Sequence, residues 1–170
     1  MEGYKIFIGN KDNFENNYGF QFEEGKIYET DQEIFPKKAG FHFAKRLEDT
    51  LRYGNAREED VIICKVTALG KIIEYEDDYY GYYDLYVTDK IRIDKILTRE
   101  DIISYALELS EYRLERFIQT MKLSDEEVKL FMGKSPMVDK YILFYHYNDE
   151  NAFNTQYAKG DKYYGRWKNI

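Results

Sequence analysis

The sequence is poor in cysteine, proline and tryptophan, and it lacks a long apolar run. Its 170 residues include one cysteine, two prolines and one tryptophan. The lone Cys64 excludes a disulfide within the chain and favours a reducing compartment. No segment reaches the roughly 18 apolar residues of a membrane span, and the start, MEGYKIFIGN, lacks the basic region of a signal peptide. We therefore expect an intracellular, cytoplasmic protein that does not enter a membrane.

Several catalytic and cofactor motifs are also missing. The two histidines, His42 and His146, do not form an HExxH motif, and no CxxC pair exists, so we expect no metal site. The GxSxG nucleophile elbow is absent, as are the phosphate-binding motifs GxGxxG and GxxxxGK[ST]. Ordinary serine hydrolases, dinucleotide-binding domains and P-loop proteins are therefore excluded, and these motifs indicate no cofactor.

The chain is acidic and unusually rich in tyrosine. Its net charge is −7 and its isoelectric point is about 5.0. This charge repels a phosphate backbone and disfavours direct, general binding of nucleic acid. There are 18 tyrosines and 11 phenylalanines. Because tyrosine packs like an apolar ring while its hydroxyl needs water or a partner, this content indicates a half-solvated core edge or a sticky surface.

The first 98 residues have the pattern of a sheet. A short helix follows residue 44, with Leu47 and Leu51 on one side and an end at Gly54. The strands are expected from runs of alternating or β-branched residues at 4–8, 19–29 (a hairpin that turns at Glu24 and Gly25), 40–44, 60–75 (broken near Gly70) and 83–97.

Helical spacing replaces the strand pattern after residue 98. Thr98 and Asp101 are spaced like a capping box, and the apolar positions that follow predict one helix of roughly twenty residues. Ser124 and Glu127 are spaced to cap a second, shorter helix, which ends at Gly133.

The segment KYILFYHY at 140–147 is aromatic and β-branched, so we expect a strand there, followed by a polar tail. The order of strands, helices and a strand predicts an α+β fold with a mostly antiparallel sheet. Residues 1–98 would form the β-rich body. Residues 99–170 would form a helical segment with a C-terminal strand and tail, packed with the body as one domain.

His42 lies at the centre of the strand GFHF. In a strand Phe41 and Phe43 share one face, and His42 points to the other. One interpretation is a histidine that faces outward or packs on the sheet. The functional interpretation requires a cleft on that face and a second polar group.

The most biased segment is EYEDDYYGYYDLY at 74–86, which we call the acidic ribbon. It combines five carboxylates with many tyrosines and has no basic residue, and it lacks the spacing of a calcium loop. It is either a solvated hairpin tip or a surface for a basic protein partner, since tyrosine offers contact area and carboxylates attract cations. The candidate partner-binding residues are Glu74, Glu76, Asp77, Asp78, Tyr79, Tyr80, Tyr82, Tyr83 and Asp84.

The tail KGDKYYGRWK at 159–168 is basic and aromatic. Such a pattern can stack on single-stranded nucleic acid. The alternatives are that the tail packs onto the acidic body or mediates self-association into a homo-oligomer.

The blocks GFQFEEGKIYE, AGFHFAKRLEDTLRYG and VTDKIRIDKIL, in this order, resemble an uncharacterised domain family of phages and prophages. Members of that family share the patterns GFQ[YF]…GK.YE, GFHF and TDKI.I. The resemblance covers residues 3–97 and implies no activity. It favours a non-catalytic interaction protein that inhibits a host-defence or nucleic-acid-binding protein by presenting the acidic ribbon to a basic partner.

A second resemblance links GFHFAKRLEDTLRYG and VIICKVTALGKIIE to the ADP-ribosyltransferase pattern of the poly-ADP-ribose polymerase type. It implies that His42 stands where that family carries its nicotinamide-stacking tyrosine and that residues 90–93 lie on its last strand. The place of the catalytic glutamate holds Tyr82 or Asp84, and residues 18–21 are nearest to the family's H-G-[ST] block. The alternative function is therefore an NAD-dependent enzyme with an atypical site at His42, Tyr82 and Asp84, and NAD would be its cofactor.

Overall fold

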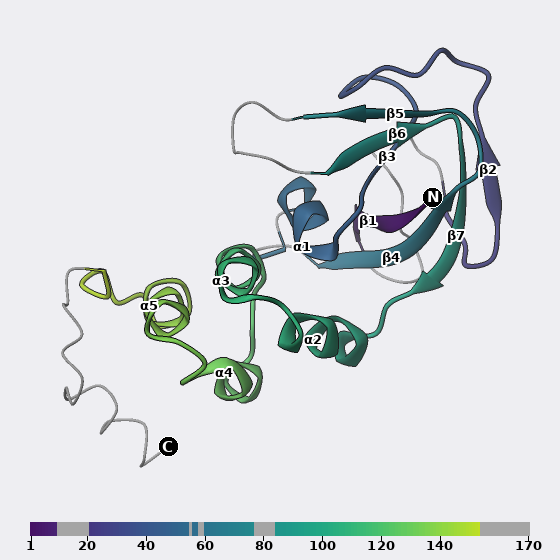
Figure 1. Cartoon of the computed structure of the whole chain (residues 1–170). Coiled ribbons are helices and arrows are strands. Elements are labelled where there is room, and N and C mark those ends of the chain that lie inside the picture. The colour runs from purple at the N-terminus through teal and green to yellow at the C-terminus, as the bar shows by residue number, and fades with distance from the viewer. Residues whose placement is uncertain (10–20, 55, 58–59, 77–83, 154–170) are drawn as a thin grey trace. The chain divides into compact units, whose positions relative to one another are not determined.

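The computed structural model describes residues 1–9, 21–54, 56–57, 60–76 and 84–153. The protein is α+β: its described residues form a seven-stranded antiparallel sheet and five α-helices (Figure 1). The chain divides into two compact units. Unit 1 comprises residues 1–106 and 120–122 and contains the whole sheet, whereas unit 2 comprises residues 107–119 and those from 123 onward and is helical where it is described.

The strand order in the sheet is β2-β7-β4-β1-β3-β6-β5, and every neighbouring pair is antiparallel. The strands expected at 4–8 and 40–44 are confirmed, and the regions 60–75 and 83–97 each contain two strands. The strands are β1 (Glu2–Ile8), β2 (Ile27–Glu29), β3 (Phe41–Ala44), β4 (Val61–Ala68), β5 (Ile72–Tyr75), β6 (Leu85–Thr88) and β7 (Lys90–Ile96).

The expected hairpin at 19–29 is wrong, although its turn is present. Gly25 has a φ of +82° and Lys26 N donates to the Glu23 carbonyl at 3.3 Å. The strand after the turn, β2, pairs with β7, and the described residues before the turn, 21–23, form no strand that pairs with it; residues 19 and 20 lie outside the description. A local pattern of alternation fixes the turn and the faces of a strand, but it does not reveal a partner some sixty positions further along the chain.

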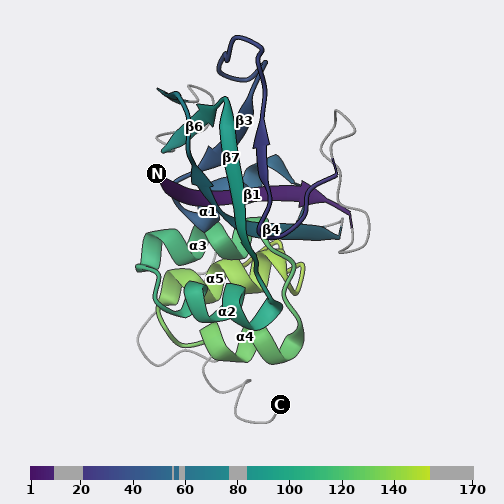
Figure 2. The same cartoon turned by 90° about the vertical axis from the view of Figure 1, so that its right-hand side faces the viewer.

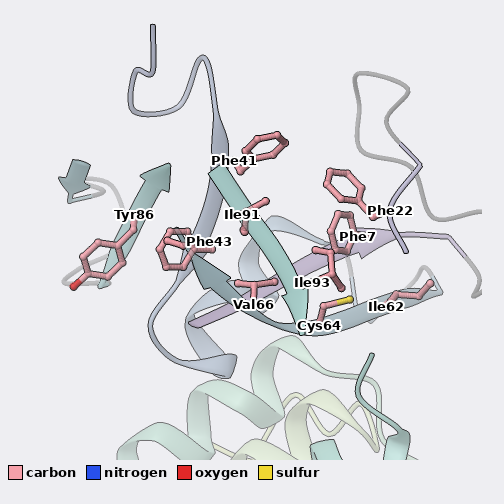
Figure 3. Close-up of a cluster of buried hydrophobic side chains, with 11 residues drawn as sticks. Phe7, Phe22, Phe41, Phe43, Ile62, Cys64, Val66, Tyr86, Ile91 and Ile93 are labelled. Carbon is pink, nitrogen blue, oxygen red and sulfur yellow. The ribbon is translucent and has the colours of Figure 1, made fainter. Parts of the chain in front are cut away.

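An aromatic core fills one face of the sheet in unit 1 (Figure 3). Ile91 and Ile93 are completely buried while Arg92 between them is exposed, as the alternation predicts. The buried members of this core are Phe7, Phe22, Phe41, Phe43, Ile62, Cys64, Val66, Ala68, Tyr86, Ile91 and Ile93.

The short helix α1 (Leu47–Thr50) packs against β1 and β3 within unit 1, and the 3₁₀ turn η1 (Leu51–Tyr53) continues it. Leu47 and Leu51 are buried, as expected from their spacing. The helix ends at Gly54, also as expected, where a Cβ atom would lie 2.7 Å from Ile6 Cδ1. A larger residue there would displace the Ile6 side chain, so glycine suits this close contact.

The capping box at Thr98 is confirmed, but the single long helix is wrong. Asp101 N donates to Thr98 Oγ1 and Thr98 N donates to Asp101 Oδ2, so that α2 (Arg99–Leu107) begins as predicted. A second helix, α3 (Glu111–Thr120), begins after Ser110.

A new helix begins after Ser110, and the Ser110 carbonyl accepts its first hydrogen bonds. Arg113 N and Leu114 N both donate to this carbonyl, at 3.0 and 2.9 Å. Serine competes with a continuous helix and favours helix starts. The apolar positions that suggested one helix therefore belong to two helices.

Helix α4 (Asp125–Phe131) confirms the second capping box. Ser124 accepts from Glu127 N, and the Glu127 side chain accepts from Ser124 N. The chain then turns at Gly133, which has a φ of +79°.

The strand expected at 140–147 is wrong: these residues lie in and just beyond α5 (Pro136–Tyr145). Ser135 caps the helix by accepting from Val138 N, and Pro136 fits its first turn. Val138 and Ile142 are completely buried at helical spacing, so packing within unit 2 overrides the β-propensity of the aromatic run.

Replacing Gly40 by Ala should destabilise the protein more than replacing Gly25 by Ala. Both glycines have a positive φ, of +102° and +82°. A Cβ atom at Gly40 would lie 2.6 Å from Val87 Cγ2, whereas no atom lies within 4 Å of one at Gly25. The strain of a positive φ costs about 1 kcal/mol in either variant, and overpacking adds a further 1–3 kcal/mol or so at Gly40 alone. Equal losses in urea unfolding would contradict this assignment.

Candidate functional site

His42 lies on β3 with the orientation predicted from the sequence. Its neighbours Phe41 and Phe43 are buried in the aromatic core, with 4% and 3% of their surface exposed. The half-buried His42 is opposite Val87 of β6, and its ring meets Tyr75 of β5 edge-on at 5.9 Å between centroids. The imidazole therefore packs on the sheet and reaches across β6 to the Tyr75 ring.

The surroundings of His42 favour the neutral imidazole. Burial lowers its pKa, and the positive charge of Lys5 lowers it further, while hydrogen bonds with the backbone of Phe35 and Gly40 oppose the shift. The Nε2 atom is buried and has no hydrogen-bond partner among the residues that the structure describes. A neutral histidine of this kind can exchange a hydrogen bond with a ligand, although the groups around it here are mainly apolar.

Lys5 adds a side-chain bond between β1 and β3, two strands whose backbone pairing is very short. The two strands share a single register pair, Tyr4 with Ala44. Beyond it Lys5 Nζ donates to the His42 carbonyl at 2.8 Å, so the side-chain amine replaces a missing backbone donor. Burial lowers the pKa of this amine from 10.5 to about 8.

Lys5 is not among the site residues predicted from the sequence, although the sequence carries a signal for it. In the predicted strand at 4–8, Lys5 has the same parity as Phe7 and must share its face. The structure places the Lys5 amine 5.2 Å from the centroid of the Phe7 ring. A lysine that alternates with a core phenylalanine is therefore the sequence signature of a buried amine.

Cys64 lies opposite Lys5 on β4 and is fully buried. Burial raises the pKa of its thiol to about 12, although the nearby charge of Lys5 acts in the other direction. The group is therefore a protonated, apolar side chain and not a reactive thiolate.

Asp84 is held away from His42. Its carboxylate pairs with Arg46 at 3.1 Å, and its carbonyl accepts from Lys45 N at 2.9 Å. Because His42 is opposite Val87, three positions further along, Asp84 is displaced by about 10 Å in the strand direction. The structure thus does not bring these two proposed catalytic residues together, and Tyr82 lies outside the described residues.

The described ends of the acidic ribbon lie on β5 and just before and along β6, and residues 77–83 lie outside the description. Glu74 and Glu76 are exposed, and neither forms a salt bridge with a described residue. Glu74 Oε1 accepts from the Tyr86 hydroxyl at 3.2 Å, and the Tyr86 ring stacks on Phe43 at 5.5 Å. The partner-binding candidates Asp77, Asp78, Tyr79, Tyr80, Tyr82 and Tyr83 belong to the part that is not described.

A second carboxylate, Glu48, is buried in α1 with only 3% of its surface exposed. The Tyr105 hydroxyl donates to Glu48 Oε2 at 2.8 Å, and the Tyr4 ring contacts Tyr105 edge-on at 5.5 Å. Burial and this carboxylate raise the pKa of Tyr105. The Glu48–Tyr105 hydrogen bond connects α1 to α2 within unit 1. The buried Glu48 carboxylate therefore has a structural role.

The described residues show neither a metal-binding cluster nor a membrane-spanning helix. Their His, Cys, Asp and Glu side chains form no group of three or more that is arranged to hold a metal ion. None of their helices combines the length and apolar character needed to span a membrane.

Unit 1 is thus an antiparallel-sheet domain that carries a buried amine and, along one edge, an acidic strand pair. Residues 1–104 match the family described as "Domain of unknown function (DUF7666)", and the chain belongs to this family. The match confirms the resemblance to an uncharacterised domain family. No curated protein matches the chain. No solved structure matches it.

Replacing Lys5 by Met should raise the free energy of unfolding most strongly below pH 8. The Lys5 amine has a pKa of about 8 in the folded protein and an ordinary value of 10.5. Below pH 8 folding therefore carries the whole cost of burying the charge, on the order of 3 kcal/mol for a shift of this size. This cost disappears as the pH rises toward 10.5, and the Met variant never carries it.

Urea unfolding of both proteins from about pH 7 to about pH 10.5 measures this difference. The advantage of the Met variant should shrink steadily over this interval, because the titration of other groups affects both proteins alike. Lys71→Met removes an exposed lysine and controls for the loss of a positive charge. An advantage of Lys5→Met that does not change with pH would show that the amine is not buried.

Proposed function

We propose that this chain is a non-catalytic interaction protein that binds a basic protein partner through the acidic ribbon. The observation that carries the proposal is the exposure of Glu74 and Glu76, neither of which forms a salt bridge with a described residue. These carboxylates lie on and beside β5, which ends the strand order of the sheet. A surface of one sign that is not neutralised by its own chain attracts a partner of the opposite sign.

Several other carboxylates of unit 1 are neutralised locally. Glu2 pairs with Lys65 at 3.0 Å, Glu29 with Lys90 at 2.8 Å, and Asp101 with Lys95 at 2.8 Å. Asp84 likewise pairs with Arg46, so we assign it a structural role and not a role in binding the partner. The charge available to a partner comes from the remaining ribbon carboxylates, with the ribbon tyrosines as contact area.

The partner class follows from charge and shape. A basic groove that normally holds phosphates also accepts a protein surface that presents carboxylates. We therefore propose a nucleic-acid-binding or host-defence protein as the partner, and a phage or prophage as the source of the chain. Inhibition would result because the ribbon and the nucleic acid compete for one groove.

An NAD-dependent ADP-ribosyltransferase is the second candidate function. The buried His42 Nε2, which has no described hydrogen-bond partner, is the observation that favours a ligand at this place. The displacement of Asp84 from His42 and its pairing with Arg46 weigh against a catalytic role. We rank this candidate below the interaction protein for that reason.

Neutralising Glu76, Asp77 and Asp78 together should abolish the capture of basic proteins from a bacterial lysate, because the attraction depends on these charges. The readout is mass spectrometry of proteins retained on the immobilised full chain. The matched control neutralises three other acidic residues of unit 1, Asp31, Glu33 and Asp60, which are exposed. Equal capture by the wild type and both variants would contradict the proposed function.

NAD at about 1 mM should leave the melting temperature of the protein unchanged, because an interaction protein gains no stability from a ligand it does not bind. Thermal denaturation with and without NAD provides the measurement. A rise in the wild type that is absent from His42→Ala would instead support the enzyme.

A further inference from the structure

Some backbone groups on the outer edge of β5 have no partner in the described part of the chain, and one hydrogen bond identifies them. Lys45 N donates to the Asp84 carbonyl, which fixes the phase of the β3–β6 ladder. In an antiparallel pair the N–H and C=O groups of successive residues point alternately to the two sides. Since Asp84 points toward β3, Leu85 and Val87 point toward β5.

The same alternation continues across β5. Leu85 and Val87 are opposite Tyr75 and Ile73, so the backbone groups of these two residues face β6. The N–H and C=O groups of Ile72 and Glu74 consequently point away from the sheet. β5 ends the strand order, and no described residue pairs with this side of it (Figure 2 shows β6 and β3 side by side in this part of the sheet).

We infer that the outer edge of β5 binds an extended segment of the basic partner as an additional strand. This inference rests on the proposed function and specifies how the partner binds. An added strand receives hydrogen bonds from Ile72 and Glu74, and side chains directly opposite each other share a face of the sheet. The partner therefore places basic residues opposite Glu74 and Glu76 and apolar residues opposite Ile73 and Tyr75.

Charge selects a basic segment over a second copy of this chain. On an antiparallel edge, outward-pointing residues pair only with outward-pointing residues. Two β5 edges would therefore bring Glu74 against Gly70, Ile72, Glu74 or Glu76 of the other copy, and never against a base. The two registers that oppose glutamates are destabilised by like charges, and the other two give Glu74 no cationic partner, whereas a basic segment supplies one in its chosen register.

The test compares Glu74→Pro with Glu74→Gln in the full chain. Both variants remove the carboxylate, but only proline removes the outward N–H, and proline is tolerated at such a position of an edge strand. The probe is a fluorescent eight-residue peptide in which lysine and valine alternate, and its binding is measured by fluorescence anisotropy. Glu74→Pro should bind about tenfold more weakly than Glu74→Gln, since a strand hydrogen bond contributes about 1 kcal/mol or somewhat more.

A second measurement does not depend on the fold of the proline variant. In the wild type, the NMR signal of the Glu74 amide should shift and gain protection from hydrogen exchange when the peptide is added. Equal affinities of the two variants together with an unchanged Glu74 amide would overturn the edge assignment.

The outcomes separate this inference from the proposed function. If Glu74→Gln and Glu76→Gln weaken binding while the Glu74 amide does not respond, the acidic ribbon binds its partner by charge alone and the inference fails. If these substitutions also leave peptide binding unchanged, both proposals fail. A dimer in sedimentation that Glu74→Pro dissolves would identify a second copy as the occupant and likewise overturn the inference.

Discussion

The sheet of unit 1 depends on the contact between β1 and β3. Four strands, β2, β7, β4 and β1, lie on one side of this contact, and β3, β6 and β5 lie on the other. The two strands share only the register pair of Tyr4 with Ala44, and the Lys5 amine adds a bond to the His42 carbonyl. Gly3 completes the contact, because a Cβ atom there would lie 2.5 Å from the Ala44 carbonyl oxygen. One register pair, a close glycine contact and a lysine side chain, and not a long regular ladder, therefore join the two halves.

The contact between β1 and β3 positions the strands β3, β6 and β5, which carry the candidate functional residues. β3 carries His42 and leads to α1, and β6 and β5 carry the described ends of the acidic ribbon. Tyr86 links the aromatic core to the acidic ribbon, since its ring stacks on Phe43 and its hydroxyl donates to Glu74. The core thereby orients a strand whose outer edge and carboxylates remain available, which is the arrangement that a binding surface needs.

Local signals in the sequence were sufficient for much of the fold. The capping boxes at Thr98 and Ser124, and the hydrogen bond from Gly54 N to the Leu51 carbonyl at the end of η1, act through neighbours within a few positions, and these helix ends were predicted correctly. The pairing of β2 with β7 and the helical state of 140–145 depend on distant packing, so alternation and propensity gave the wrong answer there. The candidate site shows the same division. The alternation of the strand predicted which face of the sheet carries His42. The pairing of Asp84 with Arg46 and the bond from Lys5 to His42 join residues far apart in the sequence, so only the assembled sheet reveals them.

The ionisation of Lys5 tests this account most directly, because the contact between the halves buries its amine. Nitrogen-detected NMR of the lysine side chains in the intact protein follows each amine through its own titration. The account predicts that one amine, assigned to Lys5, titrates near pH 8 while it remains bonded to the His42 carbonyl. A Lys5 midpoint at 10.5, the ordinary value for lysine, would contradict the buried contact on which the arrangement of the two halves is based.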